Sequence, residues 1–434
     1  MRLAEKILLL TGKRSFRAHL NRRFNRDLRD FLKSDEQIVF QFVVKPEVSV
    51  IIPVFNSAHH TLRCLRSIAK DKSVEMEVIV FDNGSHDDTT QLLSRCRNIV
   101  VIKSAENLGF IKAVNAASKH AHGRFVLLLN NDATILSGSI RDAVDIFRTE
   151  ENVGAVGARI KLATGHVQEA GSIIFSDGTT DGYLRNKRHD HFSGMYMRDV
   201  DFCSGVFLML KRQQFAAMGG LDEVFSPAYY EETDLCMRIR AQGLRVIYDP
   251  TLLIEHFEFG SQPTAAAFDA ISKRLPIFLE RWQGTLDAEG FYRRSKPHIA
   301  ASRRLISRPR LLLAIDHASL EEIELRLKNI LLSASKNKWH ISLFVAGLHN
   351  VQWEHFHSLF GKKTELVLNS GTTGILKLIT ERKDFFDVIS AIGAASANAL
   401  EEVCKRNLID LGQVKVTSGL DGTELEKLLE KPLK

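Results

Sequence analysis

Three carboxylates fall within four residues of one segment, at Glu231, Glu232 and Asp234. Their neighbours are apolar or aromatic, in the order Tyr229-Tyr230-Glu231-Glu232-Thr233-Asp234-Leu235-Cys236-Met237. Burying acids among such side chains is costly unless they hold a metal ion, a proton or a charged partner. Apolar neighbours and nearby acids also raise the pKa of a carboxyl group, which suits a general base for a hydroxyl group. The segment therefore predicts a site that uses acids.

Asp234 has a second interpretation, because Arg238 follows it by one helical turn. An ion pair at this spacing is common on helices, and we favour it over a catalytic role for Asp234. Glu231 and Glu232 are then the candidates for catalysis.

Asn and Asp residues also follow four consecutive predicted strands, namely Val48–Val54, Met76–Phe81, Ile99–Lys103 and Phe125–Leu129. Predicted helices alternate with these strands, so we expect a parallel sheet covered on both faces, with its ligand beyond the carboxyl ends of the strands. Any one of these residues could be an ordinary turn or cap residue, but their occurrence after all four strands favours a site. They are Asn56, Asp82, Asn83, Asn107, Asn130, Asn131 and Asp132.

Asp132 and the later His256 suggest a metal site. One carboxylate, one imidazole and the phosphate oxygens of a substrate suit Mg²⁺ or Mn²⁺. Such an ion would neutralise the charge that develops when a nucleoside diphosphate leaves. A structural role for His256 is the alternative.

Five ordered segments resemble the motifs of family 2 glycosyltransferases with the A-type fold. They are Val48–Asn56, Asp82–Thr89, Asn107–Asn115, Asn130–Asp132 and Glu231–Gly243, within a resemblance that covers roughly Val48 to Trp282. Ser172–Tyr183, Asp201–Leu210 and Ala228–Arg238 add a similarity to bacterial rhamnosyltransferase-like enzymes of O-antigen or other cell-surface polysaccharide synthesis.

The resemblance implies an inverting transfer of a sugar from a UDP- or dTDP-type donor to a hydroxyl of a glycan or lipid-linked acceptor. It implies metal binding by Asp132 and His256, and catalysis by Glu232 with Glu231 beside it. The nucleotide-sugar would contact Pro53, Phe55, Asn56, Asp82, Asn83, Asn107, Gly109, Lys112, Asn130, Asn131 and Asp132. Two positions depart from the family pattern, because Asn130 replaces the first Asp of D-x-D and Glu232 stands where Asp is usual.

Two other functions compete with this interpretation. A sugar-nucleotide pyrophosphorylase would need a Gly-rich phosphate loop after the first strand, where this chain has Val54-Phe55-Asn56-Ser57-Ala58. A non-catalytic nucleotide-sugar or glycan-binding module on the same fold stays open because of the substitutions at Asn130 and Glu232.

The chain of 434 residues suggests two or three domains. We expect a basic amphipathic arm at 1–45, a catalytic domain at 46–300 and a smaller α/β Rossmann-like unit at 301–434. In the last unit we expect strands at Leu311–Ile315, His340–Ala346, Leu366–Leu368 and Val388–Ile392, and a capped helix from Ser319 to Leu332. This unit stops soon after its pattern is established, so we expect it to be truncated or reduced.

No run of the sequence approaches the roughly 18 apolar residues of a membrane span, and five scattered cysteines favour reduced thiols, so we expect a cytoplasmic protein. Residues 1–33 hold ten Lys and Arg against three Asp and Glu, which equals the net charge of +7 of the whole chain. Phe16, Leu20, Phe24, Leu28 and Phe31 share one helical face there. We favour a helix docked on its own domain. Peripheral contact with an anionic membrane at the inner face of the plasma membrane is the alternative, and deletion of residues 1–33 would then abolish membrane association. Nothing indicates nucleic-acid binding.

Overall fold

The computed structural model divides the chain into two compact units. Unit 1 comprises Met1–His189 and Val200–Ser295, and unit 2 comprises Asp190–Asp199 and Lys296–Lys434. The structure describes residues 3–138, 140–257, 264–295, 305–306, 309–316, 328, 339–346, 351–369, 375, 378–379, 382, 385–392, 394–405 and 415–418. The division places the N-terminal helix in unit 1. It also assigns the short segment Asp190–Asp199 to unit 2, which the sequence did not anticipate.

Unit 1 is built on a mixed sheet in which the strands run in the order β14-β8-β13-β6-β2-β3-β5. Strands β2, β3, β5 and β6 are mutually parallel, as predicted, whereas β13 is antiparallel to both β6 and β8. The central strands are β2 (Val48–Val54), β3 (Met76–Asn83), β5 (Val100–Ser104), β6 (Phe125–Leu129), β8 (Val153–Leu162), β13 (Phe207–Lys211) and β14 (Arg245–His256). The remaining strands are β1 (Ile38–Val39), β4 (Cys96–Arg97), β7 (Ala133–Ser137), β9 (Val167–Ala170), β10 (Ser172–Ile174) and β11 (Thr180–Gly182).

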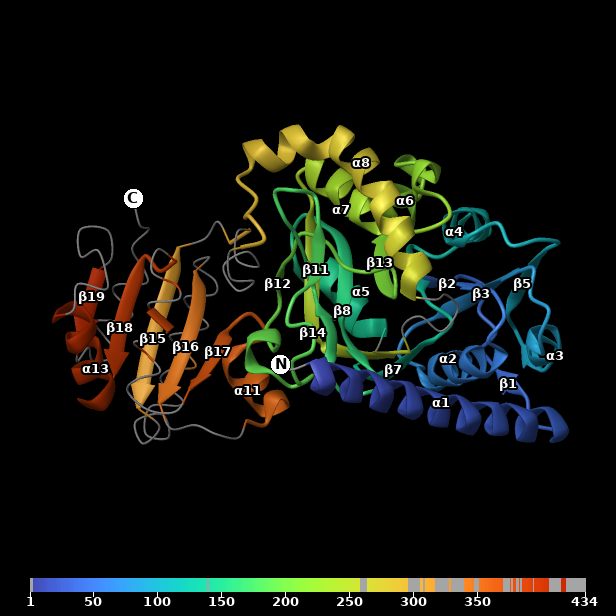
Figure 1. The fold of residues 1–434 in the computed structure, drawn as a ribbon, viewed down its shortest axis with the longest axis horizontal. Helices are drawn as coiled ribbons and strands as arrows, with labels where there is room; N and C mark the ends of the chain where they lie inside the picture. The colour runs from blue at the N-terminus through green and yellow to red at the C-terminus, as the bar shows by residue number, and fades with distance from the viewer. Residues whose placement is uncertain are drawn as a thin grey trace. The chain divides into compact units, whose positions relative to one another are not determined.

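Helices cover both sides of this sheet, because β2 and β6 are apolar on both faces and need cover on each. Figure 1 shows α1 and α2 on one side of β2 and β3 and α4 on the other. The helices are α1 (Leu3–Lys33), α2 (Ala58–Lys70), α3 (Thr89–Ser94), α4 (Phe110–Ser118), α5 (Ile140–Thr149), α6 (Arg212–Ala217), α7 (Glu231–Ala241) and α8 (Thr264–Ala288), with a 3-10 turn at Glu223–Phe225. The predicted α/β sheet between helices is thereby confirmed.

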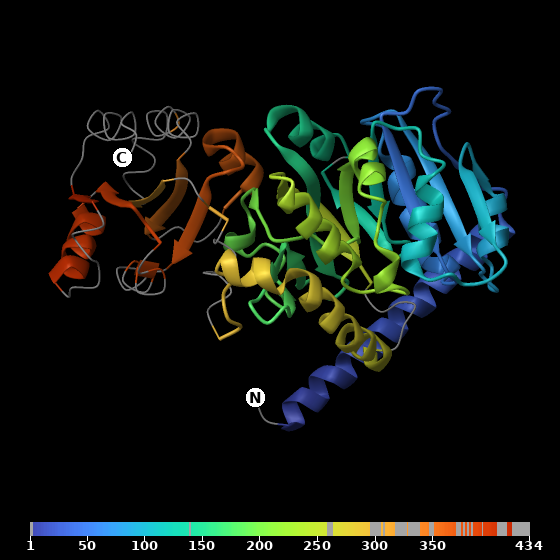
Figure 2. The same ribbon diagram turned by 90° about the horizontal axis from the view of Figure 1, so that it is seen from above.

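Helix α1 lies against α2 and uses the apolar face seen in the sequence. Phe24, Leu28 and Phe31 are buried, and the guanidinium of Arg63 lies over the Phe24 ring at 4.0 Å. Arg66 of α2 pairs with Asp27 of α1 at 3.0 Å. The favoured interpretation of a helix docked on its own domain is confirmed for this half, while Figure 2 shows the first turns of α1, in dark blue, extending beyond the rest of unit 1. No helix among the residues described above is long and apolar enough to cross a membrane, and the membrane contact stays a prediction.

Unit 2 holds a five-stranded parallel sheet in the order β17-β16-β15-β18-β19, with apolar clusters on both faces. Strands β16 and β17 lie on one side of β15, and β18 and β19 lie on the other. The Rossmann-like classification of this unit stays a prediction. Its elements are β12 (Arg198–Asp199), β15 (Arg310–Asp316), β16 (His340–Ala346), α11 (Trp353–Phe360), β17 (Glu365–Asn369), β18 (Val388–Ile392), α13 (Ala394–Lys405) and β19 (Lys415–Ser418), with a 3-10 turn at Phe192–Gly194. The four strands predicted here are confirmed, whereas the helix expected from Ser319 to Leu332 lies outside the described residues.

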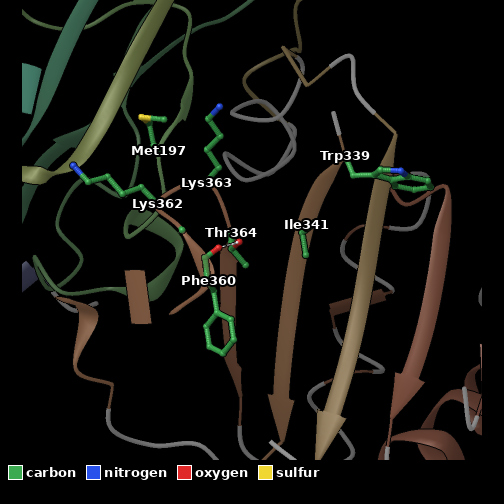
Figure 3. A pocket seen from close by; sticks show the side chains of 8 residues that line it. Met197, Trp339, Ile341, Phe360, Lys362, Lys363 and Thr364 are labelled. Atoms are coloured by element: carbon green, nitrogen blue, oxygen red, sulfur yellow. Dashed lines mark hydrogen bonds between the residues drawn. The ribbon is translucent and has the colours of Figure 1, made fainter. Parts of the chain in front are cut away.

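The segment Asp190–Asp199 is held to the rest of unit 2 by main-chain contacts. The amide of Met197 donates to the carbonyl of Lys362 at 2.7 Å, and His357 Nε2 lies 2.7 Å from the carbonyl oxygen of Met195. A cavity of about 200 Å³ lies beside this contact, and in Figure 3 the side chains of Lys362 and Lys363 point away from the Phe360 ring. It is lined by Met197, Trp339, Ile341, Phe360, Gly361, Lys362, Lys363 and Thr364. Two lysines line this cavity, and its other lining side chains carry no titratable group.

Candidate active site

A cavity of about 890 Å³ opens in unit 1 where the parallel strands end. Eleven of the residues that the sequence proposed for a site line it: Pro53, Phe55, Asn83, Asn107, Gly109, Asn130, Asn131, Asp132, Glu231, Glu232 and His256. They come from strand ends that are far apart in the sequence. The sheet therefore brings two groups of residues into one cavity. The first, the rim, consists of the Asn and Asp residues that follow the parallel strands, and the second, the acid segment, contains Glu231 and Glu232.

Three proposed residues do not line this cavity. Asp82 is buried and its Oδ1 accepts the amide hydrogen of Ser85 at 3.0 Å. Asn56 accepts from the amide of His86 at 2.8 Å. Lys112 is exposed on α4. The first two shape the loops after β2 and β3, and direct contact of all three with a nucleotide stays a prediction.

The part of the rim that includes Asn83 and Asn107 is held in place by hydrogen bonds between amide groups of its own residues. Asn83 Nδ2 donates to Asn107 Oδ1 at 2.9 Å, and Asn83 Oδ1 accepts the amide hydrogen of Leu108 at 2.8 Å. Gly109 follows with φ of 82°, and a Cβ there would lie 2.8 Å from the Cβ of Pro227. Glycine is needed at this position because the loop both turns left-handed and touches the segment leading into α7. The rim and the acid segment are thus fixed relative to each other.

Asp132 and His256 meet at the opposite end of the rim. His256 is the last residue of β14, and its Nε2 lies 3.0 Å from Asp132 Oδ1. Its Nδ1 lies 2.7 Å from Gln168 Oε1, and because an amide oxygen can only accept, Nδ1 carries the hydrogen. Burial opposes the charge of Asp132, but the charge of His256 and its hydrogen bond hold the pKa of this carboxyl below its usual value.

These two side chains fit a divalent cation. Gln168 fixes the imidazole with Nε2 directed at Asp132, which is how an outer hydrogen bond orients a metal-binding histidine. A proton between Nε2 and Oδ1 can be replaced by a metal ion, which releases that proton on binding. Within the described residues there is no group of three or more His, Cys, Asp or Glu placed to hold a metal ion. The remaining ligands would have to come from the substrate and water, as is usual for Mg²⁺.

Glu231 and Glu232 begin α7 and line the cavity side by side. The residues before them, Tyr229 and Tyr230, have φ of 76° and 70°, an uncommon conformation for non-glycine residues. Burial, then the charge of Glu232, raise the pKa of Glu231 well above its usual value. Burial also raises the pKa of Glu232, although hydrogen bonds from its own amide, from Glu231 and from the amide of Gly205 favour its charged form. The two carboxyl groups therefore favour sharing a proton, and the carboxylate that remains can accept one from a hydroxyl group.

The same pair has unmet hydrogen-bonding capacity. The Oε2 atoms of Glu231 and Glu232 are both buried and lack a hydrogen-bond partner in the described part of the chain. A buried acceptor without a donor is costly, and such groups call for an explanation such as a catalytic role. A hydroxyl group entering the cavity would supply the missing donor.

Asp234 has a different environment two residues later. Its oxygens accept from Arg238 Nε at 2.7 Å, Arg281 at 2.7 Å and Trp282 Nε1 at 2.9 Å, and its side chain is 0% exposed. The predicted ion pair with Arg238 is confirmed. Asp234 anchors α7 to α8 and is absent from the cavity lining.

Sequence reasoning missed several residues of the cavity, above all Gln168 and Glu169 on β9. Glu169 is buried and accepts from Ser172 Oγ at 2.7 Å and from the amide of Ser204 at 3.0 Å. Burial is the main cause that raises its pKa to about 7. The strand is only four residues long and buried on both faces, so it has no alternating pattern that could have marked it.

The comparisons with known proteins bear on this cavity. A family model described as "Glycosyl transferase family 2" matches residues 49–218, which run from β2 to the end of α6. This chain carries a family 2 glycosyltransferase domain. The resemblance noted in the five sequence motifs is thereby confirmed. The match includes Asp132 and the rim, while the acid pair and His256 lie beyond it.

Curated relatives match between half and three fifths of this chain. The O-antigen biosynthesis protein RfbC of Myxococcus xanthus is 28% identical over 239 residues, which cover 52% of this chain and 18% of that protein. The N-acetylglucosaminyl-diphospho-decaprenol L-rhamnosyltransferase of Mycobacterium tuberculosis is 25% identical over 261 residues, which cover 53% of this chain and 83% of that protein. An uncharacterized protein, y4gI, of Sinorhizobium fredii is 26% identical over 61% of this chain and 30% of its own length. The chain thus spans a third or less of two of these relatives.

Among solved structures, GalNAc-T7 with UDP, GalNAc and Mn²⁺ is similar to this chain with a TM-score of 0.45 and 13% identity. That likeness covers 57% of this chain and 50% of the other. At this score it carries no argument about the site.

Proposed function

We propose that this domain is an inverting, metal-dependent glycosyltransferase that moves a sugar from a UDP- or dTDP-type donor to a hydroxyl group. The acceptor is a glycan or a lipid-linked oligosaccharide of bacterial surface polysaccharide. The observation that carries the proposal is the pairing of two functions in one cavity, with Asp132 and His256 at one part of the rim and the Glu231–Glu232 pair at another. The family match and the names of the relatives support it.

In the proposed reaction an acceptor hydroxyl lies against Glu232. Its oxygen forms the new bond to the anomeric carbon of the sugar, and its proton passes to the Glu232 carboxylate. The bond between the anomeric carbon and the diphosphate oxygen breaks, and the nucleoside diphosphate leaves with that electron pair. Glu231 keeps its own proton and donates to Glu232, which orients the accepting oxygen.

Asp132 and His256 would hold the divalent cation, Mg²⁺ or Mn²⁺. When bound, the ion supplies positive charge against the diphosphate. Gln168 keeps the His256 ring in the orientation that leaves Nε2 facing Asp132. Asn130 lies 3.4 Å from the same Nε2 through its Nδ2, so the residue that replaces the usual acid is a neighbour of the histidine.

The test uses a panel of UDP-, dTDP- and GDP-sugars with lipid-linked and oligosaccharide acceptors, each with Mg²⁺, Mn²⁺ or a chelator. We expect transfer from one donor, loss of transfer with the chelator, and a drop of at least 100-fold in Asp132→Ala, because the metal and its ligand act together. Lys112→Ala, an exposed change outside the cavity, tests whether that residue contacts the donor. Metal-independent binding of a nucleotide with no transfer from any donor would instead support a non-catalytic binding module.

A further inference from the structure

Arg185 is a cavity residue that neither the sequence motifs nor the family match singled out. It lies in the turn that follows β11 and lines the same cavity as Asp132 and the acid pair. Its side chain is half-buried, while the next three side chains, at 186–188, are exposed. The turn therefore directs one of its charged side chains inward.

The turn is held in this shape by main-chain hydrogen bonds to β9 and within itself. The amide of Asn186 donates to the carbonyl of Val167 at 2.9 Å, and the amide of Val167 donates to the carbonyl of Lys187 at 2.8 Å. The residues on either side of Arg185, Leu184 and Asn186, have φ of 62° and 67°. Non-glycine residues adopt this conformation at a cost, and positions that keep it cluster at functional sites.

The strand that holds this turn also orients the metal-binding side. β9 carries Gln168, which contacts His256, and Glu169. Burial raises the pKa of Glu169, and the charge of Arg185 is a smaller effect that opposes this rise. Arg185 is thus tied to the part of the cavity where Asp132 and His256 meet. Its charge acts on the carboxyl group of Glu169.

The lining of the cavity is rich in acids, which makes a cationic side chain there favourable for an anionic donor. Five carboxyl groups line it, at Asp132, Glu169, Asp181, Glu231 and Glu232. The guanidinium groups in the lining are those of Arg185 and Arg294. Arg294 lies 3.7 Å from Asp181 Oδ2 and its side chain is 52% exposed, whereas the Arg185 side chain is half-buried. A cationic side chain in the lining would add to the metal ion in offsetting these acids when a diphosphate enters.

We propose that the Arg185 guanidinium binds the diphosphate of the nucleotide-sugar donor and stabilises the charge that this group gains as it leaves. The inference rests on the proposed function, since it takes the donor to be a nucleotide-diphospho-sugar. Guanidinium groups suit this task because their fork of N–H donors matches phosphate oxygens and their charge persists at all working pH values. Arg185 is then a catalytic residue on the leaving-group side, opposite in role to Glu232.

The experiment compares wild type, Arg185→Gln, Arg185→Lys and the matched control Lys187→Gln, which removes one exposed charge from the same turn. Binding of UDP, dTDP and GDP, and of the nucleosides uridine, thymidine and guanosine, is measured by calorimetry with Mg²⁺ or Mn²⁺. We expect Arg185→Gln to weaken nucleoside diphosphate binding at least tenfold and to leave nucleoside binding within twofold. Arg185→Lys should recover part of the loss, and Lys187→Gln should match wild type.

Transfer kinetics with the active donor complete the test. We expect kcat to fall about 100-fold in Arg185→Gln, as when one preorganised donor to a developing negative charge is removed. Unchanged diphosphate binding in Arg185→Gln, an equal loss of nucleoside binding, or an effect confined to the KM of a phosphate-bearing acceptor would each overturn the inference. A wild type that binds none of the three nucleoside diphosphates would instead overturn the proposed function. If Arg185→Gln does not fold, Arg185→Lys decides by the same criteria, since it keeps the charge but loses the fork.

Discussion

The first turn of α7 presents two kinds of buried acid side by side. Glu231 and Glu232 have raised pKa values, and the Oε2 atom of each lacks a hydrogen-bond partner among the described residues. Asp234, two residues later, accepts hydrogen bonds from two arginines and a tryptophan. The acids differ in the direction of their side chains, because Asp234 contacts α8 whereas Glu231 and Glu232 line the cavity.

This contrast separates a structural acid from a reactive one by what surrounds it. A carboxylate with every lone pair engaged by cations and N–H groups stays ionised and holds elements together. A carboxyl group buried with missing donors is destabilising by itself, and proteins keep such groups where function needs them. The three acids that look alike in the sequence should therefore respond in opposite ways to the same substitution.

The largest expected effect is the loss of sugar-transfer rate in the Glu232→Gln variant. The amide keeps the shape of the side chain but cannot take the acceptor proton, so we expect kcat to fall about 1000-fold, within the usual range for loss of a general base. That loss corresponds to about 4 kcal/mol of activation free energy. Single-turnover transfer at saturating donor and acceptor measures it, with Glu231→Gln as the companion variant. Full turnover in Glu232→Gln would show that the base is another group.

The second effect is on the stability of Asp234→Asn. This change leaves Arg238 and Arg281 facing a neutral group, and breaking a buried ion pair of this kind costs several kcal/mol. Because both guanidinium groups also reach solvent, we expect a loss of about 3 kcal/mol in the free energy of unfolding. Urea denaturation measures it, and the activity of the folded fraction should stay within a few-fold of wild type. A stable variant with no activity would place Asp234 among the reactive acids and remove the contrast.

The smallest effect is the pH dependence of stability in Glu169→Gln. The pKa of Glu169 is raised from 4.5 to about 7, so between these values the unfolded chain loses a proton that the folded chain keeps. The wild type consequently loses stability relative to the variant as pH rises from about 4.5 to 7, with no further change above that range. The difference is at most about 3 kcal/mol, and Glu169→Gln should be the more stable protein at pH 8 but not at pH 4.5.

Denaturation at the two pH values measures this difference. The amide can still accept from the Ser204 amide and can donate to Ser172, whose hydroxyl rotates, so the variant should fold. Equal stability of wild type and variant at both pH values would mean that Glu169 is not held in its protonated form. Glu169 would then be a structural acid, as Asp234 is.

The parts of the fold with a strong local pattern were predictable. The buried strands β2, β3 and β6 are short apolar runs bounded by polar turns, and the apolar face of α1 recurs at helical spacing. The short strand β9 was not predictable. It has no alternation of its own, and its position depends on pairing with β8.

The candidate site divides in the same way. The rim after the strands could be expected because parallel strands place their carboxyl ends at one edge, and all four polar ends were visible in the sequence. Gln168, Glu169 and Arg185 join the cavity through contacts between segments that are distant along the chain. Side-chain identity alone could not distinguish them from ordinary polar loop residues.

The sequence by itself determined which chemical groups this protein has at its strand ends and at the start of α7, because local patterning fixes those elements. Only the tertiary structure decided which acids are satisfied. Asp234 meets Arg281 and Trp282 from α8, whereas Glu231 and Glu232 meet each other. The physical reason is that the pKa and the reactivity of a carboxyl group depend on burial and on donors supplied by other elements, and neither is encoded in the spacing of residues along the chain.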